Sequence, residues 1–265
     1  MKRYLKKVVF WAHGQGDLSG LTDDCSQGVL YIVDRKQELE WLKGMGLPVL
    51  AWLHENNKEE DLSRASYGVE DPKALDMDFY EKVYRREKNI PWEILETERL
   101  LIREMIPEDA AAFEAIYKEP AIRRYMKDFH EDAVGEAEYI REYQAHYRFY
   151  EYGVWSVVLK ETGEVVGRVG FSDMQELSCK VPEELPGVTE EEYLPCFGYM
   201  IGVPWQRQGY AEEAGRAILD YAREELGFTT VLLQVEEENE ASVRLAKKLG
   251  FEDTEMSCQV FKKVL

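Results

Sequence analysis

One segment constrains this chain more than any other: an apolar strand that runs into a tight polar turn and then directly into a helix. We expect the strand over residues 196–203, the turn over 206–211 and the helix over 210–226. The first N–H groups of a helix lack partners within the helix and lie at the positive end of its dipole. Gly209 lets the backbone approach a bound group closely, and Arg207 can add positive charge. The segment therefore predicts an anion site suited to a pyrophosphate, although an ordinary strand-to-helix connection can look similar.

A second polar motif follows after that helix and one further expected strand, over residues 230–235. It consists of Asn239-Glu-Ala-Ser242 and then Lys248-Leu-Gly-Phe251. Asn is favoured at the N-cap of a helix and Gly just after its end, so a helix is expected over 240–249. By itself this motif describes an ordinary capped helix. Its position directly behind the first segment gives it weight.

The residues upstream complete one αβ pattern, which predicts a domain over 93–265 joined to the rest of the chain near Asn89-Ile-Pro-Trp92. Apolar alternation predicts strands, and a Pro followed by acidic residues suits the first turn of a helix. The expected elements are strands over 99–103, 155–159 and 165–171, the last two forming a hairpin, a helix opened by Pro107, a helix over 137–150, and about one more strand after residue 250.

Together these motifs make the chain resemble the GNAT superfamily of N-acetyltransferases, in the branch that includes ribosomal-protein N-terminal acetyltransferases. The segment Gln206-x-x-Gly209-x-Ala211 is similar to the acetyl-CoA signature of that family, the Asn239 and Lys248 motifs to its second motif, and residues 96–104 to its opening strand. The resemblance implies an α/β (α+β) fold with a mixed, splayed sheet flanked by helices. It also implies acetyl-CoA as co-substrate and no metal. The implied cofactor-binding residues are Met200, Ile201, Val203, Gln206, Arg207, Gln208, Gly209, Tyr210, Ala211, Asn239 and Ser242.

Two departures from the family pattern concern proton transfer. Ala246 stands where many relatives carry a tyrosine that protonates the departing thiolate, and Cys196 stands where relatives often carry a glutamate. The resemblance gives Ser242 as a candidate acid, with a hydroxyl packed within its helix as the alternative. The candidate bases are Asp173 and Glu255. Cys196 is either an acyl-accepting nucleophile or, as is usual for a strand cysteine, a packing residue.

The reaction that the resemblance implies is direct attack of a neutral amine on the thioester in a ternary complex. Holding the two reactants together supplies much of such catalysis, and backbone N–H groups near residues 200–203 would stabilise the oxyanion. Two functions remain open: a working N-acetyltransferase, and a CoA-binding regulatory protein whose catalysis has lapsed. A scaffold whose first domain binds a partner is a third.

The first 92 residues carry a shorter pattern, which predicts a small Rossmann-like α/β domain of unknown role. The unbroken apolar run at 28–33 predicts a buried strand, and Asp34 with Gln37 resembles the capping box of a helix over 34–42. Further strands are expected over 47–53 and 67–69, and a helix over 75–86. The pattern faintly resembles the late part of haloacid-dehalogenase-type phosphatases. Their aspartate nucleophile motif is absent, so no phosphatase activity is inferred.

Polar residues follow two of these expected strands, at Asp34 and at His54-Glu55-Asn56. Open α/β sheets place ligands at the carboxyl ends of their strands. Helix capping and loop polarity explain the same residues without a ligand.

The chain is acidic, with 52 Asp and Glu against 33 Lys and Arg and a formal net charge of -19. This balance repels phosphate backbones, so we expect no nucleic-acid partner, and it favours a cationic amine acceptor, either a small molecule or a protein N-terminus. Solubility alone is the other explanation. Residues 174–194 hold six glutamates against one lysine, which suits either a lid on the acceptor side or a solvated loop.

The four cysteines, Cys25, Cys179, Cys196 and Cys258, are widely spaced and form no C-x-x-C pair. We therefore expect neither a disulfide framework nor a zinc site, and a reducing cytoplasm fits. The apolar run at 8–12 is too short for a signal peptide or a membrane span. We expect a cytoplasmic protein without a membrane partner and leave a homodimer open.

Overall fold

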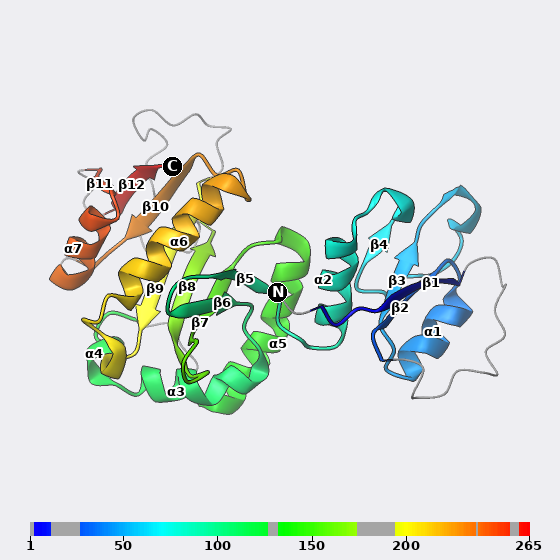
Figure 1. The fold of residues 1–265 in the computed structure, drawn as a ribbon, viewed down its shortest axis with the longest axis horizontal. Coiled ribbons are helices and arrows are strands. Elements are labelled where there is room, and N and C mark those ends of the chain that lie inside the picture. The colour runs from blue at the N-terminus through cyan, green and yellow to red at the C-terminus, as the bar shows by residue number, and fades with distance from the viewer. Residues whose placement is uncertain (1–2, 12–26, 127–131, 174–193, 237, 255–259) are drawn as a thin grey trace. The chain divides into compact units, whose positions relative to one another are not determined.

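The computed structural model describes residues 3–11, 27–126, 132–173, 194–236, 238–254 and 260–265. The chain divides into two compact units, Met1–Trp92 and Glu93–Leu265, each with its own sheet (Figure 1). Among the described residues, no helix is long and apolar enough to cross a membrane. The candidate base Glu255, three of the four cysteines and nearly all of the acidic segment 174–194 lie outside the described residues.

The first unit is a parallel four-stranded sheet in the order β1-β2-β3-β4. Every residue of β2 is buried, because alternate side chains pack on opposite faces: Tyr31 contacts the core under the first helix, and Leu30 the core under the second. A strand covered on both faces needs an unbroken apolar run. The elements are β1 (Lys7–Trp11), β2 (Val29–Val33), α1 (Lys36–Gly44), β3 (Val49–Trp52), β4 (Gly68–Val69) and α2 (Met77–Glu87), with short 3-10 turns at Glu55–Asn57 and Pro72–Ala74.

The second unit is a mixed eight-stranded sheet in the order β11-β12-β10-β9-β8-β7-β6-β5. All neighbours are antiparallel except β9 and β10, which are parallel. Its strands are β5 (Glu93–Glu96), β6 (Leu100–Arg103), β7 (Val154–Leu159), β8 (Val165–Ser172), β9 (Cys196–Ile201), β10 (Thr230–Gln234), β11 (Glu252–Asp253) and β12 (Val260–Val264).

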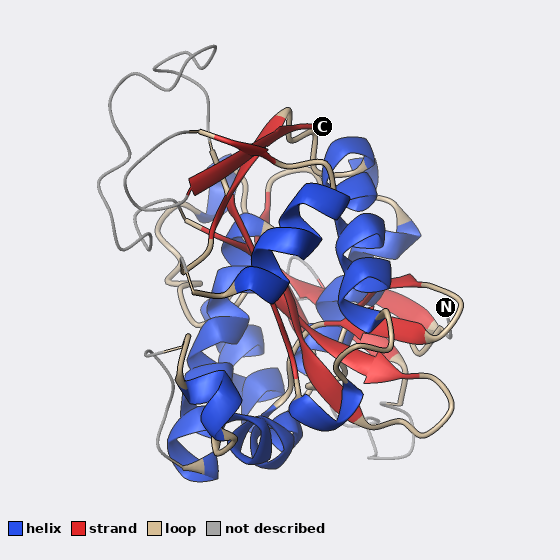
Figure 2. Ribbon diagram, turned by 90° about the vertical axis from the view of Figure 1, so that its left-hand side faces the viewer, coloured by secondary structure: helices blue, strands red, loops and turns tan. Residues whose placement is uncertain are grey.

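Helices cover both faces of this sheet (Figures 1 and 2). On one face the ring centre of Phe113 lies 3.8 Å from the guanidinium of Arg168 on β8. On the other face the ring of Tyr221 packs edge-on against the buried Trp155 of β7. Helices α3 and α5 lie on the first face, and α6 and α7 lie on the second. The helices are α3 (Ala110–Tyr117), α4 (Pro120–Arg123), α5 (Ala133–Tyr150), α6 (Tyr210–Glu224) and α7 (Glu240–Lys248), with 3-10 turns at Pro107–Asp109 and Val203–Trp205.

The predicted α/β class with a mixed, helix-flanked sheet is confirmed, and the differences are local. The apolar run at residues 8–12, for which no strand was predicted, lies mostly in the edge strand β1. Residues 93–103 form two antiparallel strands instead of one, and two short strands follow α7. The helix α5 begins earlier than the apolar pattern indicates, because the Asp132 side chain accepts a hydrogen bond from Gly135 N–H and caps it.

Candidate functional site

The sheet of the second unit opens between β9 and β10. These strands pair only at Cys196 and Leu232, where Leu232 N–H donates to the carbonyl of Pro195 at 3.0 Å. On its other edge, β9 pairs with β8 along its whole length. An unpaired strand edge presents N–H and C=O groups to whatever extended chain lies beside it. Beyond Cys196, the described residues thus leave such an edge on β9.

The register decides which backbone groups face this open edge. Gly202 N–H donates to the Val166 carbonyl at 2.9 Å, so in the antiparallel ladder the even-numbered residues of β9 point toward β8. The N–H groups of Tyr199 and Ile201 point the other way, into the gap. Of the N–H groups near residues 200–203 that were expected to stabilise the oxyanion, those of Met200 and Gly202 therefore face β8, and that of Ile201 faces the gap. Strand alternation is the reason for the change.

The turn after β9 has an unusual backbone. Arg207 and Gly209 have φ of 61° and 85°, both in the left-handed region, and Gly209 is the N-cap of α6. Left-handed residues within a turn curve successive N–H groups into a concave nest that binds anions. Among the described residues, no side chain caps α6, so no capping side chain takes the first N–H groups of this helix. Residues 206–209 are exposed to solvent, so this backbone is accessible to a ligand.

The two glutamines of the turn bind the chain itself. Gln206 Nε2 donates to the carbonyl of Ile201 and Gln208 Nε2 to that of Pro204, each at 2.9 Å. Both bonds tie the turn back to the end of β9. We assign these side chains to holding the turn in shape, together with the Gln206 N–H, which donates to the Val203 carbonyl at 3.2 Å.

Arg99, which precedes β6, clamps the same turn from the opposite end of the unit's sequence. Its Nη1 donates to the Gln208 carbonyl at 2.9 Å, and its Nε to Glu213 Oε2 in the first turn of α6 at 2.6 Å. Its guanidinium also lies 4.3 Å from the ring centre of Tyr210. Sequence reasoning missed Arg99, since nothing near it in the chain points to the turn.

The carboxylate of Glu213 accepts two further hydrogen bonds, from the Thr97 hydroxyl and from the Arg99 N–H. Burial alone would raise the pKa of Glu213, but hydrogen bonds from Thr97 and from the backbone and side chain of Arg99 outweigh it, and the pKa lies below its ordinary value. The clamp is therefore an ionised pair at neutral pH.

The second motif stands across the gap from β9. Asn239 caps α7, accepting from Ser242 N–H at 3.1 Å, and the hydroxyl of Tyr199 donates to the Ser242 carbonyl at 3.5 Å. Burial raises the pKa of Tyr199, against a smaller lowering by the hydrogen bond with Ser242. Ala246 is fully buried. The structure thus brings Tyr199 of β9 close to Asn239 and Ser242 on the opposite wall of the gap.

The remaining predicted residues lie elsewhere. Asp173 follows β8, where its charge acts on His146 of α5; burial lowers the pKa of that histidine more than Asp173 raises it. Cys196 is buried in β9, as expected of a packing cysteine. Within the described ranges, no cluster of three or more His, Cys, Asp or Glu side chains could hold a metal ion.

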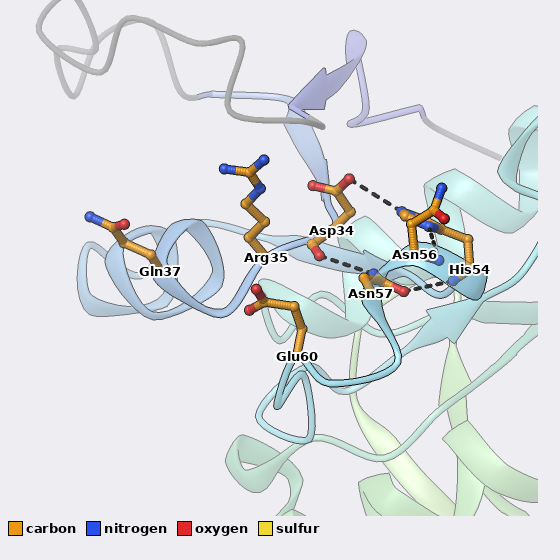
Figure 3. A pocket seen from close by; sticks show the side chains of 7 residues that line it. All are labelled: Asp34, Arg35, Gln37, His54, Asn56, Asn57 and Glu60. Carbon is orange, nitrogen blue, oxygen red and sulfur yellow. Dashed lines mark hydrogen bonds and ion pairs between the residues drawn. The ribbon is translucent and has the colours of Figure 1, made fainter.

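The first unit has a polar pocket of about 400 Å³ at the carboxyl ends of β2 and β3 (Figure 3). His54 Nδ1 accepts from Asn56 N–H at 3.2 Å, so Nε2 carries the proton and donates to Asp34 Oδ2 at 3.3 Å. The Asn57 amide donates to the carbonyls of Asp34 and Trp52 and accepts from His54 N–H. The lining residues are Asp34, Arg35, Gln37, His54, Asn56, Asn57 and Glu60.

The capping box expected at Asp34 and Gln37 is wrong. The N-cap of α1 is Arg35, without a side-chain bond, and the first N–H of the helix, from Lys36, donates to Glu60 Oε2 at 2.9 Å. Asp34 is 2% exposed and turns to His54 instead. The strand end holds Asp34 where it cannot reach the helix.

The chain is similar to known proteins at the level of family, sequence and fold. Residues 99–252 match the family described as acetyltransferase (GNAT) domain. The chain is 30% identical over 157 residues to the uncharacterized protein YkkB of Bacillus subtilis, covering 59% of this chain and 83% of that protein. It is 27% identical over 160 residues to the uncharacterized N-acetyltransferase YoaA of the same species, covering 60% and 82%. A ribosomal-protein-S5-alanine acetyltransferase from Vibrio fischeri shares the fold, with a TM-score of 0.51, 13% identity, and coverage of 64% and 95%.

Proposed function

The chain belongs to the GNAT acetyltransferase family, and from that premise we propose that it moves an acetyl group from acetyl-CoA to a primary amine, either a protein N-terminus or a small amine. The observation that carries the proposal is the junction of the open β9 edge with the uncapped start of α6. An extended amide chain can continue the sheet at such an edge, and a pyrophosphate suits the helix start at its end. Acetyl-CoA has both parts in that order.

In this proposal each motif has one task. The backbone of residues 206–211 binds the pyrophosphate, and α7 lines the far side of the pantetheine slot with Asn239 and Ser242. The N–H groups of Tyr199 and Ile201 face the gap and are suited to stabilise the oxyanion of the tetrahedral intermediate. Catalysis then comes mainly from holding amine and thioester together.

For the acceptor we propose a cationic amine. The formal charge of -19 attracts cations and speeds their encounter with the protein, and one solved structure of this fold acts, by its name, on a ribosomal protein. We propose that the reaction belongs to residues 93–265 and that the first unit takes no part in the chemistry.

The test is thiol release from acetyl-CoA in the presence of spermidine or of a peptide with a free N-terminal serine, together with calorimetry of acetyl-CoA binding. A working enzyme binds acetyl-CoA and releases thiol faster with at least one amine than without. Binding without amine-dependent release would instead favour the CoA-binding regulatory protein. A fragment of residues 93–265 serves as the control for the first unit, and we expect it to match the full chain.

A further inference from the structure

The departing thiolate needs a proton, and the usual donor position cannot supply it. Ala246 has no dissociable proton and is fully buried against the core. Ser242 lies in the first turn of α7, and its hydroxyl, with an ordinary serine's acidity, is a weak proton donor. A second hydroxyl beside the gap, with a more acidic proton, is therefore of interest.

Tyr199 provides that hydroxyl. Its backbone N–H faces the open edge of β9, and its side chain leaves the strand on the face covered by α6 and α7. Its ring lies 5.8 Å from that of Phe197, which in turn stacks on Phe251 at 5.8 Å. This packing fixes the direction of the ring, so the hydroxyl reaches Ser242 in the first turn of α7. The phenol thus bridges the two walls of the gap.

We propose that Tyr199 is the general acid that protonates the departing thiolate, in place of the tyrosine that Ala246 replaces. The inference rests on the proposed acetyl transfer. It assigns a role to a side chain that the sequence motifs do not mark, and it leaves Ser242 as the group that positions the phenol.

The surroundings of the hydroxyl suit a proton donor. Its bond to the Ser242 carbonyl is 3.5 Å long, at the outer limit for a hydrogen bond, so little is lost when the proton turns to another acceptor. Burial raises the pKa of Tyr199 and keeps the phenol protonated at neutral pH. A CoA thiolate bound beside this half-buried phenol would lose part of its hydration, which raises the pKa of its thiol and favours the transfer.

The protons balance without an added reagent. The ammonium form of the acceptor first releases one proton to bulk water; the neutral amine then attacks the thioester carbonyl carbon, a C–N bond forms, and the carbonyl π pair moves to oxygen. Collapse restores the carbonyl and breaks the C–S bond; the sulfur leaves with the bonding pair and takes the phenolic proton. The acylated nitrogen now carries one proton too many, and this proton returns through water to the Tyr199 phenolate. The products are an N-acetyl amide and the CoA thiol.

The test uses the full chain with the variant Tyr199→Phe, which removes only the hydroxyl. With spermidine or the serine-initiated peptide as acceptor, we expect kcat to fall about 100-fold, the usual range for losing a general acid. The Kd of acetyl-CoA by calorimetry should stay within about twofold, because the ring and backbone remain. Tyr221→Phe is the matched control: it removes a phenol hydroxyl from α6, on the same face of the sheet, and should keep the parent kcat.

A pH profile separates an acid from a packing residue. The parent should lose kcat at alkaline pH as the phenol ionises, and Tyr199→Phe should lack this limb. Site-specific replacement of Tyr199 by 3,5-difluorotyrosine, which lowers the phenol pKa, should move the limb to lower pH. This second variant keeps the ring and hydroxyl, so it tests the proposal even where the Phe variant folds poorly.

Three results would overturn the role of Tyr199: a kcat within about threefold of the parent, a rise in acetyl-CoA Kd that accounts for the whole loss, or an alkaline limb unchanged by fluorination. A parent protein that binds acetyl-CoA but releases no thiol with either amine would contradict the proposed acetyl transfer, and the role of Tyr199 as its general acid would fail as well. An active parent with an unaffected Phe variant would overturn the acid alone.

Discussion

The two units both gather polar groups at the end of a strand, yet they use them in opposite ways. At the ends of β2 and β3, the side chains of Asp34, His54 and Asn57 bond to one another and to nearby backbone. At the end of β9, Gln206 and Gln208 tie a turn back to the strand, and none of the described side chains caps the helix that follows. A cluster of polar side chains is therefore a poor guide to a binding site. A helix start whose N–H groups no capping side chain takes is a better one.

Disturbing the backbone of the turn before α6 should have the largest effect on cofactor binding. Gly209→Glu puts a side chain at φ 85° and a negative charge beside the phosphate position; a Cβ there would also lie 3.2 Å from Arg99 Nη2. We expect the Kd of acetyl-CoA, measured by calorimetry, to rise about 100-fold, or about 3 kcal/mol.

The control for that variant is the same substitution at another left-handed glycine. Gly163, in the β7–β8 turn, has φ 74°, and a Cβ added to it would meet no described atom within 4 Å. Gly163→Glu should lower stability by about 1–2 kcal/mol through backbone strain while leaving the Kd unchanged. Equal affinity of Gly209→Glu and the parent would remove the turn from the site.

The polar cluster of the first unit should respond in stability rather than in binding. Asp34→Ala deprives the half-buried His54 ring of this acceptor, and we expect a loss of about 1–3 kcal/mol in the first unit. Hydrogen exchange of the β2 and β3 amides measures that unit separately. Asp78→Ala, which breaks an exposed pair with Arg3, should cost less than about 1 kcal/mol. A weakened acetyl-CoA affinity in Asp34→Ala would mean that the first unit serves the site after all.

Removing the contacts of Arg99 with the turn should have a smaller effect on the affinity for acetyl-CoA. Arg99→Ala removes the support of the Gln208 carbonyl and of Glu213, so the turn should populate other conformations. We expect the Kd of acetyl-CoA to rise about tenfold, or about 1.4 kcal/mol, with kcat nearly unchanged. Arg223→Ala, on the exposed side of the same helix, is the control and should change neither. A fall in kcat at constant Kd would argue against a clamp.

The smallest effect is the pH dependence of the clamp. The pKa of Glu213 lies below its ordinary value of 4.5, so the clamp stabilises the fold fully above about pH 4.5 and loses that contribution as the pH falls through the lowered pKa. We expect Glu213→Gln to reduce the acid-induced drop in the Tm of the second unit by about 2 °C. Glu224→Gln on the same helix should leave the drop as it is. Parallel curves for Glu213→Gln and the parent would show that the pair contributes nothing to stability.

Sequence patterns predicted the elements of the second unit because those patterns are local. The strand at residues 196–201, the turn with Gly209 and the helix after it are determined by neighbours along the chain. Arg99 could not be found this way, since its partner Glu213 lies 114 positions further on. The strand β1 was missed for a similar reason. Two of its five side chains are partly buried and one is fully buried, so its burial gives little local signal. It is a strand because it pairs with β2.

Local patterns in the sequence were enough to predict the family, the α/β class and the place of the turn before α6, because Gly209, Asn239 and Gly250 act through their own backbone and nearest neighbours. Only the tertiary structure decided that β9 parts from β10 after one pair, that Tyr199 rather than Met200 turns its N–H to the gap, and that Asp34 bonds to His54 instead of capping a helix. These outcomes depend on strand register and on contacts between residues far apart in the chain. Register is set by how whole strands pack, and no single segment carries that information.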